Sequence, residues 1–244
     1  MKPNSIPAGK NHSSTDTTRN TTSLITMDED TVKTGTEQTT SPGPLLVFVL
    51  GAPCSGKSTL CAALAKRYNL AHLSLGDELR SLVSDTPSNP VSRIKHLFSD
   101  AELDTFRNNL SAGTLGPVHL TPKYVKERVF PASCEPENVR MLIDGFPRDS
   151  ERWVPFKEFA KPVWAPSRTS VLIVLDVDKE VAWERFTRRG RAGDVFERRF
   201  EEHTRLVPSI LEAMRKDEMI IFSVRKEENA NVEATVDRLT GLLG

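Results

Sequence analysis

Residues 45–60 read LLVFVLGAPCSGKSTL, and this stretch decides the fold. The apolar run ends at Gly51, a glycine-rich turn follows, and a helical pattern begins near Lys57. A strand, a loop with the spacing GxxxxGKS and a helix in this order are typical of a phosphate-binding loop. Gly51 and Gly56 let the backbone curl so that successive N–H groups face one anion, and the helix start adds the positive end of its dipole. A chance glycine-rich turn is the alternative, and the full spacing behind a strand argues against it.

The residues of this loop have defined expected roles. Lys57 can reach the β- and γ-phosphates of a nucleoside triphosphate, and the Ser58 hydroxyl can bind Mg²⁺. Cys54 lies inside the loop, where we interpret a free cysteine as a small hydrophobic residue. We expect ATP to contact nine consecutive residues: Gly51, Ala52, Pro53, Cys54, Ser55, Gly56, Lys57, Ser58 and Thr59.

The composition argues against several classes of partner and site. The 244 residues include 33 Lys and Arg and 33 Asp and Glu, so the formal net charge is zero. No net positive field therefore attracts nucleic acid or anionic membranes. The three cysteines have no CxxC spacing, which argues against a disulfide framework and a zinc site and favours a reducing compartment. No apolar run approaches the roughly 18 residues of a membrane span. We therefore expect a cytoplasmic monomer with no nucleic-acid or membrane partner.

The first 43 residues differ in composition from the rest of the chain. They are rich in Ser, Thr and Asn, and they predict a disordered tail because too little apolar surface is available to offset the entropy of ordering. A mitochondrial presequence is the alternative. The acidic stretch 28–30 and the single arginine, Arg19, argue against it. Pro42-Gly43-Pro44 marks the boundary of a domain over residues 44–244.

Short apolar runs alternate with helical patterns through this domain. Besides 45–51, the expected strands lie at 70–74, 139–144, 171–176 and 219–224. This alternation predicts an α/β fold, with a five-stranded parallel sheet between two layers of helices. Ligands of such sheets bind at the carboxyl ends of the strands, so Gly51, Ser74, Asp144 and Asp176 should face one crevice. The polar stretch 84–99 is interpreted as a flexible insertion.

A second cluster of chemistry follows the strand at 139–144. Residues 142–148 read LIDGFPR, so a carboxylate leaves the strand end and an arginine follows four residues later. Asp144 can hold Mg²⁺ through a water, and the planar guanidinium of Arg148 suits a second phosphate. The alternative is an ordinary strand-end turn with a solvated arginine.

Arginines gather around residue 190. Arg185 and Arg189 share a helix face at i, i+4, where like charges repel unless an anion lies between them. The alternative is a solvated basic face paired with nearby glutamates, and we favour it for Arg188 and Arg198. The whole group consists of Arg185, Arg188, Arg189, Arg191, Arg198 and Arg199.

Five ordered motifs between Leu45 and the C-terminus resemble the adenylate kinase family of nucleoside monophosphate kinases, which includes the UMP/CMP kinases. They read GAPCSGKST, HLSLGDELR, GTLGPVHLT, LIDGFPRD and RRGRAGD followed by ERRF. The resemblance implies transfer of the ATP γ-phosphoryl group to a nucleoside monophosphate (NMP), with Mg²⁺. It also implies a mobile NMP-binding region over about 74–120 and a short lid over about 189–195.

The resemblance also assigns roles by position. Lys57 would bind the transferred phosphoryl group, Arg80 and Arg148 the acceptor phosphate, and Asp144 would hold Mg²⁺ through water. Arg189, Arg191 and Arg199 match the lid and hinge arginines that neutralise the reacting phosphates, with Arg185 a weaker match. An acceptor phosphate is already anionic near neutral pH and needs no general base, so His72, His119 and His203 are interpreted as structural. The implied acceptor contacts are Ser74, Gly76, Arg80, Val118, Gly145, Arg148 and Arg152.

The chain departs from the family in its lid and its base-reading positions. Gly193-Asp194 offers one aspartate where the family has two. Leu75 and Arg152 match neither the adenylate kinase nor the UMP/CMP pattern, whereas Pro117-Val118 with Thr121 favours the pyrimidine branch. Arg152 could donate to a base carbonyl such as O2 of a pyrimidine or O6 of guanine.

Two other function classes remain open from the residues. One is a nucleotide-binding regulatory protein on the same fold, with little or no kinase turnover. The other is a phosphate-loop small-molecule kinase or ATPase. A hydroxyl acceptor would require a carboxylate base, while the acceptor side is marked by Arg80 and Arg148.

Overall fold

A computed structural model of the chain describes residues 43–166, 170–190 and 195–243. The predicted tail at 1–43 therefore lies outside the described residues, except for its last residue, as do positions 191–194 of the expected lid. Among the described residues, no helix combines the length and the apolar character that crossing a bilayer requires.

The domain is built on a five-stranded parallel sheet with the order β2-β3-β1-β4-β5. The central strand β1 (Leu45–Gly51) pairs with β3 (Arg140–Asp144) and β4 (Ser170–Leu175), while β2 (Ala71–Ser74) and β5 (Ile220–Val224) form the edges. The predicted five-stranded parallel sheet is confirmed. Parallel strands require crossovers, and helices connect the strands as the alternating pattern predicts.

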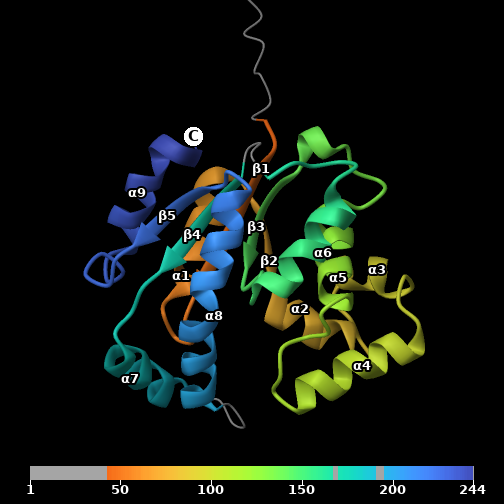
Figure 1. The fold of residues 1–244 in the computed structure, drawn as a ribbon, viewed down its shortest axis with the longest axis horizontal. Coiled ribbons are helices and arrows are strands. Elements are labelled where there is room, and N and C mark those ends of the chain that lie inside the picture. The colour runs from red at the N-terminus through yellow and green to blue at the C-terminus, as the bar shows by residue number, and fades with distance from the viewer. Residues whose placement is uncertain (1–42, 167–169, 191–194, 244) are drawn as a thin grey trace, which may run out of the picture. The chain divides into compact units, whose positions relative to one another are not determined.

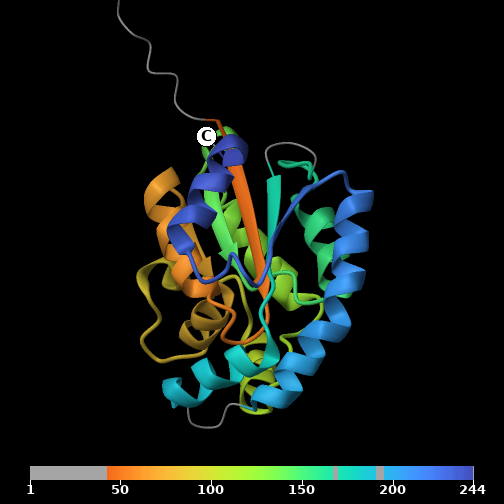
Figure 2. The ribbon, with the colours of Figure 1, turned by 90° about the vertical axis from the view of Figure 1, so that its left-hand side faces the viewer.

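Helices cover both faces of the sheet (Figures 1 and 2). On one face lie α1 (Lys57–Tyr68) and α9 (Val232–Leu243). On the other lie α5 (Leu120–Val129), α6 (Ser150–Ala160) and α8 (Phe196–Lys216). The protein therefore has the expected three layers, with an apolar core on each side of the sheet.

The continuous apolar run of β1 follows from this layering. Leu46, Phe48 and Leu50 belong to the core beneath α6 and α8. The alternate residues Val47 and Val49 belong to the core beneath α1 and α9. A strand that is buried on both faces loses the alternation of polar and apolar residues, because successive side chains enter different cores.

The remaining helices lie toward the carboxyl ends of the strands (Figure 1). They are α2 (Leu75–Leu82), α3 (Asn89–Lys95), α4 (Asp100–Ser111) and α7 (Lys179–Arg189), and a 3₁₀ turn η1 (Pro136–Asn138) precedes β3.

The interpretation of 84–99 as a flexible insertion was wrong for residues 89–95, which form α3. Val91 and Ile94, three residues apart, are buried in the same core as α5. Pro90 lies in the first turn of the helix, where a missing N–H is tolerated. A polar stretch with two well-spaced apolar residues can therefore form a helix when a neighbouring core accepts them.

A buried ion pair ties α2 to α5. Glu78 accepts hydrogen bonds from Arg128 Nε and Nη2, each at 2.8 Å, and from the Tyr124 hydroxyl at 2.7 Å. Only 10% of the Glu78 side chain and 14% of the Arg128 side chain are exposed. Since α2 also carries Arg80, this pair holds that arginine relative to the rest of the domain.

Removing one partner of this pair would leave a buried charge without compensation. We expect Arg128→Met to lower the free energy of unfolding by about 3 kcal/mol, measured by urea denaturation. Arg107→Met is the matched control, because Arg107 pairs with Asp104 on the exposed surface of α4, and it should change stability little. Equal losses in the two variants would contradict the role given to the buried pair.

Candidate active site

The loop between β1 and α1 leaves no room for a side chain at its first glycine. A Cβ atom on Gly51 would lie 2.5 Å from Ser55 Oγ and 3.2 Å from the carbonyl oxygen of Leu175. Gly56 precedes α1 with a φ of 97°, a left-handed conformation that favours glycine. The buried Ser55 hydroxyl has no hydrogen-bond partner among the described residues. A curled backbone at a helix start is suited to hold a phosphate.

The ammonium group of Lys57 lies against this loop. Its Nζ donates to the carbonyl oxygens of Gly51 at 2.7 Å and Ala52 at 3.0 Å. Burial lowers the pKa of Lys57, and the carboxylate of Asp144 opposes this shift. The positive charges of Arg148 and Arg199 lower the same pKa further. Lys57 therefore lies in a cluster of positive charge that a bound anion would stabilise.

Asp144 ends β3 at the carboxyl edge of the sheet and pairs in register with Ser74 of β2. Only 8% of Asp144 is exposed, and burial raises its pKa, while Lys57 and His72 act in the opposite direction. The next residue, Gly145, has a φ of 82°, and its N–H donates to the carbonyl oxygen of Val49 at 3.1 Å. The strand therefore ends in a tight turn that leads directly to Arg148.

Arg80 and Arg148 come from separate elements and converge at Gly76. A Cβ atom on Gly76 would lie 3.6 Å from Arg80 Nη1 and 3.7 Å from Arg148 Nη2. Arg80 also pairs with Asp77, which accepts a hydrogen bond from Ser74 Oγ at 2.7 Å. Burial lowers the pKa of Arg148, which places a second desolvated cation beside Lys57. Two convergent guanidinium groups match the oxygens of one phosphate.

A cleft of about 710 Å³ joins these parts. Its wall includes residues 53–59 of the loop. It also includes the arginines of the acceptor side and the arginines of α7 and α8. The predicted site residues that line it are Pro53, Cys54, Ser55, Gly56, Lys57, Ser58, Thr59, Ser74, Gly76, Arg80, Asp144, Arg148, Arg185, Arg189 and Arg199. Arg191 lies outside the described residues.

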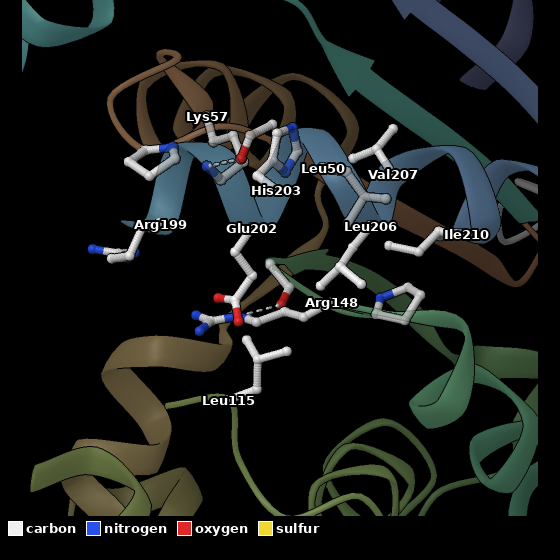
Figure 3. A pocket seen from close by; sticks show the side chains of 14 residues that line it. Leu50, Lys57, Leu115, Arg148, Arg199, Glu202, His203, Leu206, Val207 and Ile210 are labelled. Atoms are coloured by element: carbon white, nitrogen blue, oxygen red, sulfur yellow. Dashed lines mark hydrogen bonds between the residues drawn. The ribbon is translucent and has the colours of Figure 1, made fainter. Parts of the chain in front are cut away.

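A smaller cavity of about 110 Å³ adjoins the loop beneath α8. Gly51, Lys57, Gly145, Arg148 and Arg199 line it, together with Glu202 and His203, which the sequence analysis did not place in the site. In Figure 3, Glu202 points toward Arg148, and His203 lies near Lys57. Glu202 follows Arg199 by three residues in α8, and residues three apart lie on the same face of a helix. The sequence therefore contained a signal that Glu202 lies beside Arg199 in the site.

Five predicted acceptor or loop residues do not line the cleft. Gly51 and Gly145 line the smaller cavity instead, and Ala52, Val118 and Arg152 line neither space. The Arg152 side chain is buried, pairs with Asp149 and donates from Nε to the carbonyl oxygen of Gly116 at 2.9 Å. Its guanidinium thus faces protein groups in this structure, whereas Gly116 itself lines the cleft. Arg152 therefore supports the cleft wall from behind.

The arginines near residue 190 differ in their partners: one pairs with a surface glutamate, and two donate to backbone carbonyl oxygens of other segments. Arg188 pairs with Glu184 at 3.3 Å on the surface, in agreement with the solvated interpretation. Arg185 instead donates to the carbonyl oxygen of Cys54 in the loop at 3.3 Å. Arg198 is exposed, as the solvated interpretation expects, but it donates to the carbonyl oxygen of Gly113 at 2.9 Å and not to a glutamate. This last contact joins the start of α8 to the end of α4.

Asn229 is a further residue that the sequence analysis missed. Its Nδ2 donates to the carbonyl oxygens of Ser55 at 2.7 Å and Asp176 at 2.8 Å. The amide thereby joins the phosphate-binding loop to the end of β4. No motif surrounds Asn229 in the sequence, so only the folded chain shows this role.

Comparison with known proteins decides the family. A protein-family model described as an AAA domain matches residues 50–203. UMP-CMP kinase from Homo sapiens is 30% identical over 150 residues, which make up 61% of this chain and 69% of the relative. The chain belongs to this class of phosphate-loop domains and to the adenylate kinase-like family of nucleoside monophosphate kinases.

Other members of the adenylate kinase-like family extend the match. UMP-CMP kinase from Mus musculus is 26% identical over 199 residues, covering 81% of this chain and 94% of the relative. UMP-CMP kinase 3 from Oryza sativa subsp. japonica is 33% identical over 116 residues, covering 48% of this chain and 47% of the relative. The resemblance inferred from the five motifs is thus confirmed at the level of the family.

The contacts of Lys57 predict a specific loss of nucleotide binding. We expect Lys57→Met to weaken Mg-ATP binding by roughly tenfold or more in isothermal titration, because a charge-assisted contact to phosphate is removed. The control is Lys66→Met, since Lys66 is exposed on the same helix and should bind ATP like the wild type. Equal affinities of the two variants would rule out the expected contact.

His203 predicts a pH dependence of stability. Burial lowers the pKa of His203 to about 4, and the positive charge of Lys57 is a smaller cause of the same shift. A histidine in the unfolded chain has a pKa of about 6.5. Between these values the unfolded chain binds a proton that the folded chain does not. The stability due to neutral His203 is therefore fully present above about pH 6.5 and is lost as the pH falls toward 4.

We expect His203→Gln to reduce the fall in melting temperature between pH 7 and 4.5. The exposed His119 provides the control, because His119→Gln should leave the pH profile of the wild type unchanged. Parallel profiles for wild type and His203→Gln would show that the histidine is not held neutral.

Proposed function

We propose that this protein transfers the γ-phosphoryl group of ATP to a nucleoside monophosphate. One observation carries the proposal: Arg80 and Arg148 converge at Gly76, in the same cleft as the phosphate-binding loop. The loop would hold the triphosphate of the phosphoryl donor. The pair of guanidinium groups would hold the phosphate of the acceptor, so the cleft can bind both substrates of a phosphoryl transfer. The relatives named UMP-CMP kinase support the same activity.

The positive side chains between the two ends would stabilise the reacting phosphates. Lys57, Arg148 and Arg199 each line both the cleft and the smaller cavity. A phosphate acceptor is already anionic, so positioning and charge neutralisation suffice without a general base. This fits the neutral state of His203, whose lowered pKa keeps it from carrying charge at neutral pH.

Ser58 and Asp144 fit a magnesium ion. Ser58 is exposed at the start of α1, Asp144 ends β3, and both line the cleft with Lys57. Ser58 would bind the ion directly, and Asp144 would hold it through water. When bound, Mg²⁺ neutralises charge on the β- and γ-phosphate oxygens.

The contact between Arg198 and Gly113 supports closure of the cleft over its substrates. It joins α8, which carries Arg199, to the end of α4 on the acceptor side. Exclusion of water would prevent hydrolysis of ATP, which competes with transfer.

Among acceptors, we favour UMP and CMP, with AMP next. The names of the relatives and the residues Pro117, Val118 and Thr121 support the pyrimidine choice. The Thr121 hydroxyl is buried without a hydrogen-bond partner among the described residues, directly beneath Gly116. Arg152, which is held by Asp149 and Gly116, would shape the base site through Gly116 and not by touching the base.

Two alternatives predict different products. A nucleotide-binding regulatory protein would bind ATP and form no diphosphate, and the short spacing between Arg191 and Arg199 is the feature that favours it. A kinase for hydroxyl acceptors would use a carboxylate base. Asp77 is the carboxylate on the acceptor side, but it already accepts hydrogen bonds from Ser74 and Arg80.

The deciding experiment supplies Mg-ATP with UMP, CMP, dCMP, AMP or GMP in separate reactions and measures diphosphate formation. We expect product with UMP and CMP at the highest kcat/KM. ATP binding without product from any acceptor would favour the regulatory protein and overturn the kinase proposal.

Arg148 should be essential for the acceptor. We expect Arg148→Ala to lower kcat/KM for the acceptor by roughly 100-fold or more, because a cation aimed at the reacting phosphates is removed. Arg80→Ala should act in the same direction. Arg107→Ala on the exposed face of α4 is the control and should keep the wild-type rate. Near wild-type rates for both site variants would refute the assignment.

A further inference from the structure

Three side chains of different metal-binding types meet on the face of the sheet covered by α1. They are Cys61 of α1, His72 of β2 and Asp144 of β3. One ligand atom from each, the thiol sulfur, an imidazole nitrogen and a carboxylate oxygen, lies within 4.8 Å of the other two. The lack of CxxC spacing argued against a zinc site in the sequence, but these ligands come from separate elements.

The strand register explains why they meet. His72 pairs with Leu142, and Ser74 pairs with Asp144, so His72 and Asp144 project from the same face of neighbouring strands. Cys61 packs in the core cluster of Leu142 on that face. The position of α1 over the sheet therefore brings the thiol to the two strand residues.

The three groups are available to a ligand. Within the part of the chain that the structure describes, the Asp144 carboxylate accepts no hydrogen bond, although the residue is 8% exposed. Lys57, whose positive charge acts on Asp144, is hydrogen bonded to the carbonyl oxygens of Gly51 and Ala52 instead. His72 is exposed and Cys61 is fully buried, so an ion would enter past the imidazole.

The chemistry of the donor set selects the metal. Mg²⁺ and Ca²⁺ prefer oxygen ligands, whereas a thiolate, an imidazole and a carboxylate suit Zn²⁺. Tetrahedral zinc holds its ligand atoms roughly 3.5 Å apart, so a contraction of at most about 1.3 Å from the 4.8 Å limit would complete three positions and leave the fourth to water. On binding, the Cys61 thiol loses its proton to solvent and a zinc–sulfur bond forms.

We propose that Cys61, His72 and Asp144 bind Zn²⁺, and that the bound ion inhibits the enzyme by occupying the carboxylate that Mg²⁺ requires. The inhibition rests on the proposed kinase function, and the binding does not. Asp144 would then serve two metals in exclusive states, one that supports transfer and one that prevents it.

Binding is tested by titrating the whole protein with Co²⁺, a spectroscopic substitute for Zn²⁺. We expect one Co²⁺ per chain, a thiolate-to-cobalt absorption band in the near ultraviolet, and loss of the band when Zn²⁺ is added. His72→Gln, at an exposed position, should weaken binding at least tenfold. Cys61→Ala and Cys61→Ser should abolish the band, with circular dichroism confirming that each variant is folded.

The other two cysteines provide the controls for this titration. Cys54→Ala and Cys134→Ala should retain the band, because neither thiol belongs to the cluster. A band that is absent from the wild type, survives in Cys61→Ala or disappears in Cys54→Ala would overturn the site.

Inhibition is tested by measuring diphosphate formation at buffered free Zn²⁺ concentrations. We expect the wild type to lose activity, and His72→Gln to require at least tenfold more Zn²⁺ for the same loss. Binding of Zn²⁺ at the site without inhibition would refute the regulatory part of the proposal. An absence of kinase activity at all Zn²⁺ concentrations would instead refute the proposed function, and the cobalt titration would still decide the metal site.

Discussion

Repulsion among buried cations is the constraint on which this site depends. Burial lowers the pKa values of both Lys57 and Arg148, and Arg199 adds its charge to each. Asp144 opposes the shift at both residues. Glu202 also opposes the shift at Arg148. A chain of phosphates would add the negative charge that such a cluster of cations favours in a poorly solvated space. The domain is therefore arranged to receive anions.

The parallel sheet is what makes this concentration of charge possible. Because all five strands point the same way, their ends deliver Gly51, Ser74 and Asp144 to one edge. The tight turn after β3 adds Arg148, and α2 adds Arg80, which the buried pair of Glu78 and Arg128 holds indirectly. The rigid core sets the positions, and the loops and helix ends supply the chemistry.

Asp144 illustrates how one position can serve several demands. Its carboxylate is buried, lies near Lys57 and faces a thiol and an imidazole on the same side of the sheet. A carboxylate with few fixed hydrogen bonds is free to meet an ion, and which ion it meets depends on the other ligands within reach. Because Asp144 lies at the edge of the sheet where several strands end, ligands for more than one kind of metal ion lie within its reach.

The sequence alone determined the phosphate-binding loop, the parallel sheet and the family, because each is encoded in the spacing of residues close together in the chain. Only the tertiary structure decided that Arg152 turns to Gly116, that Arg198 reaches Gly113, and that α3 forms within a polar stretch. It also decided that Cys61 meets His72 and Asp144. These contacts join residues that are distant in the chain, or depend on a core built by other elements, so no local pattern specifies them.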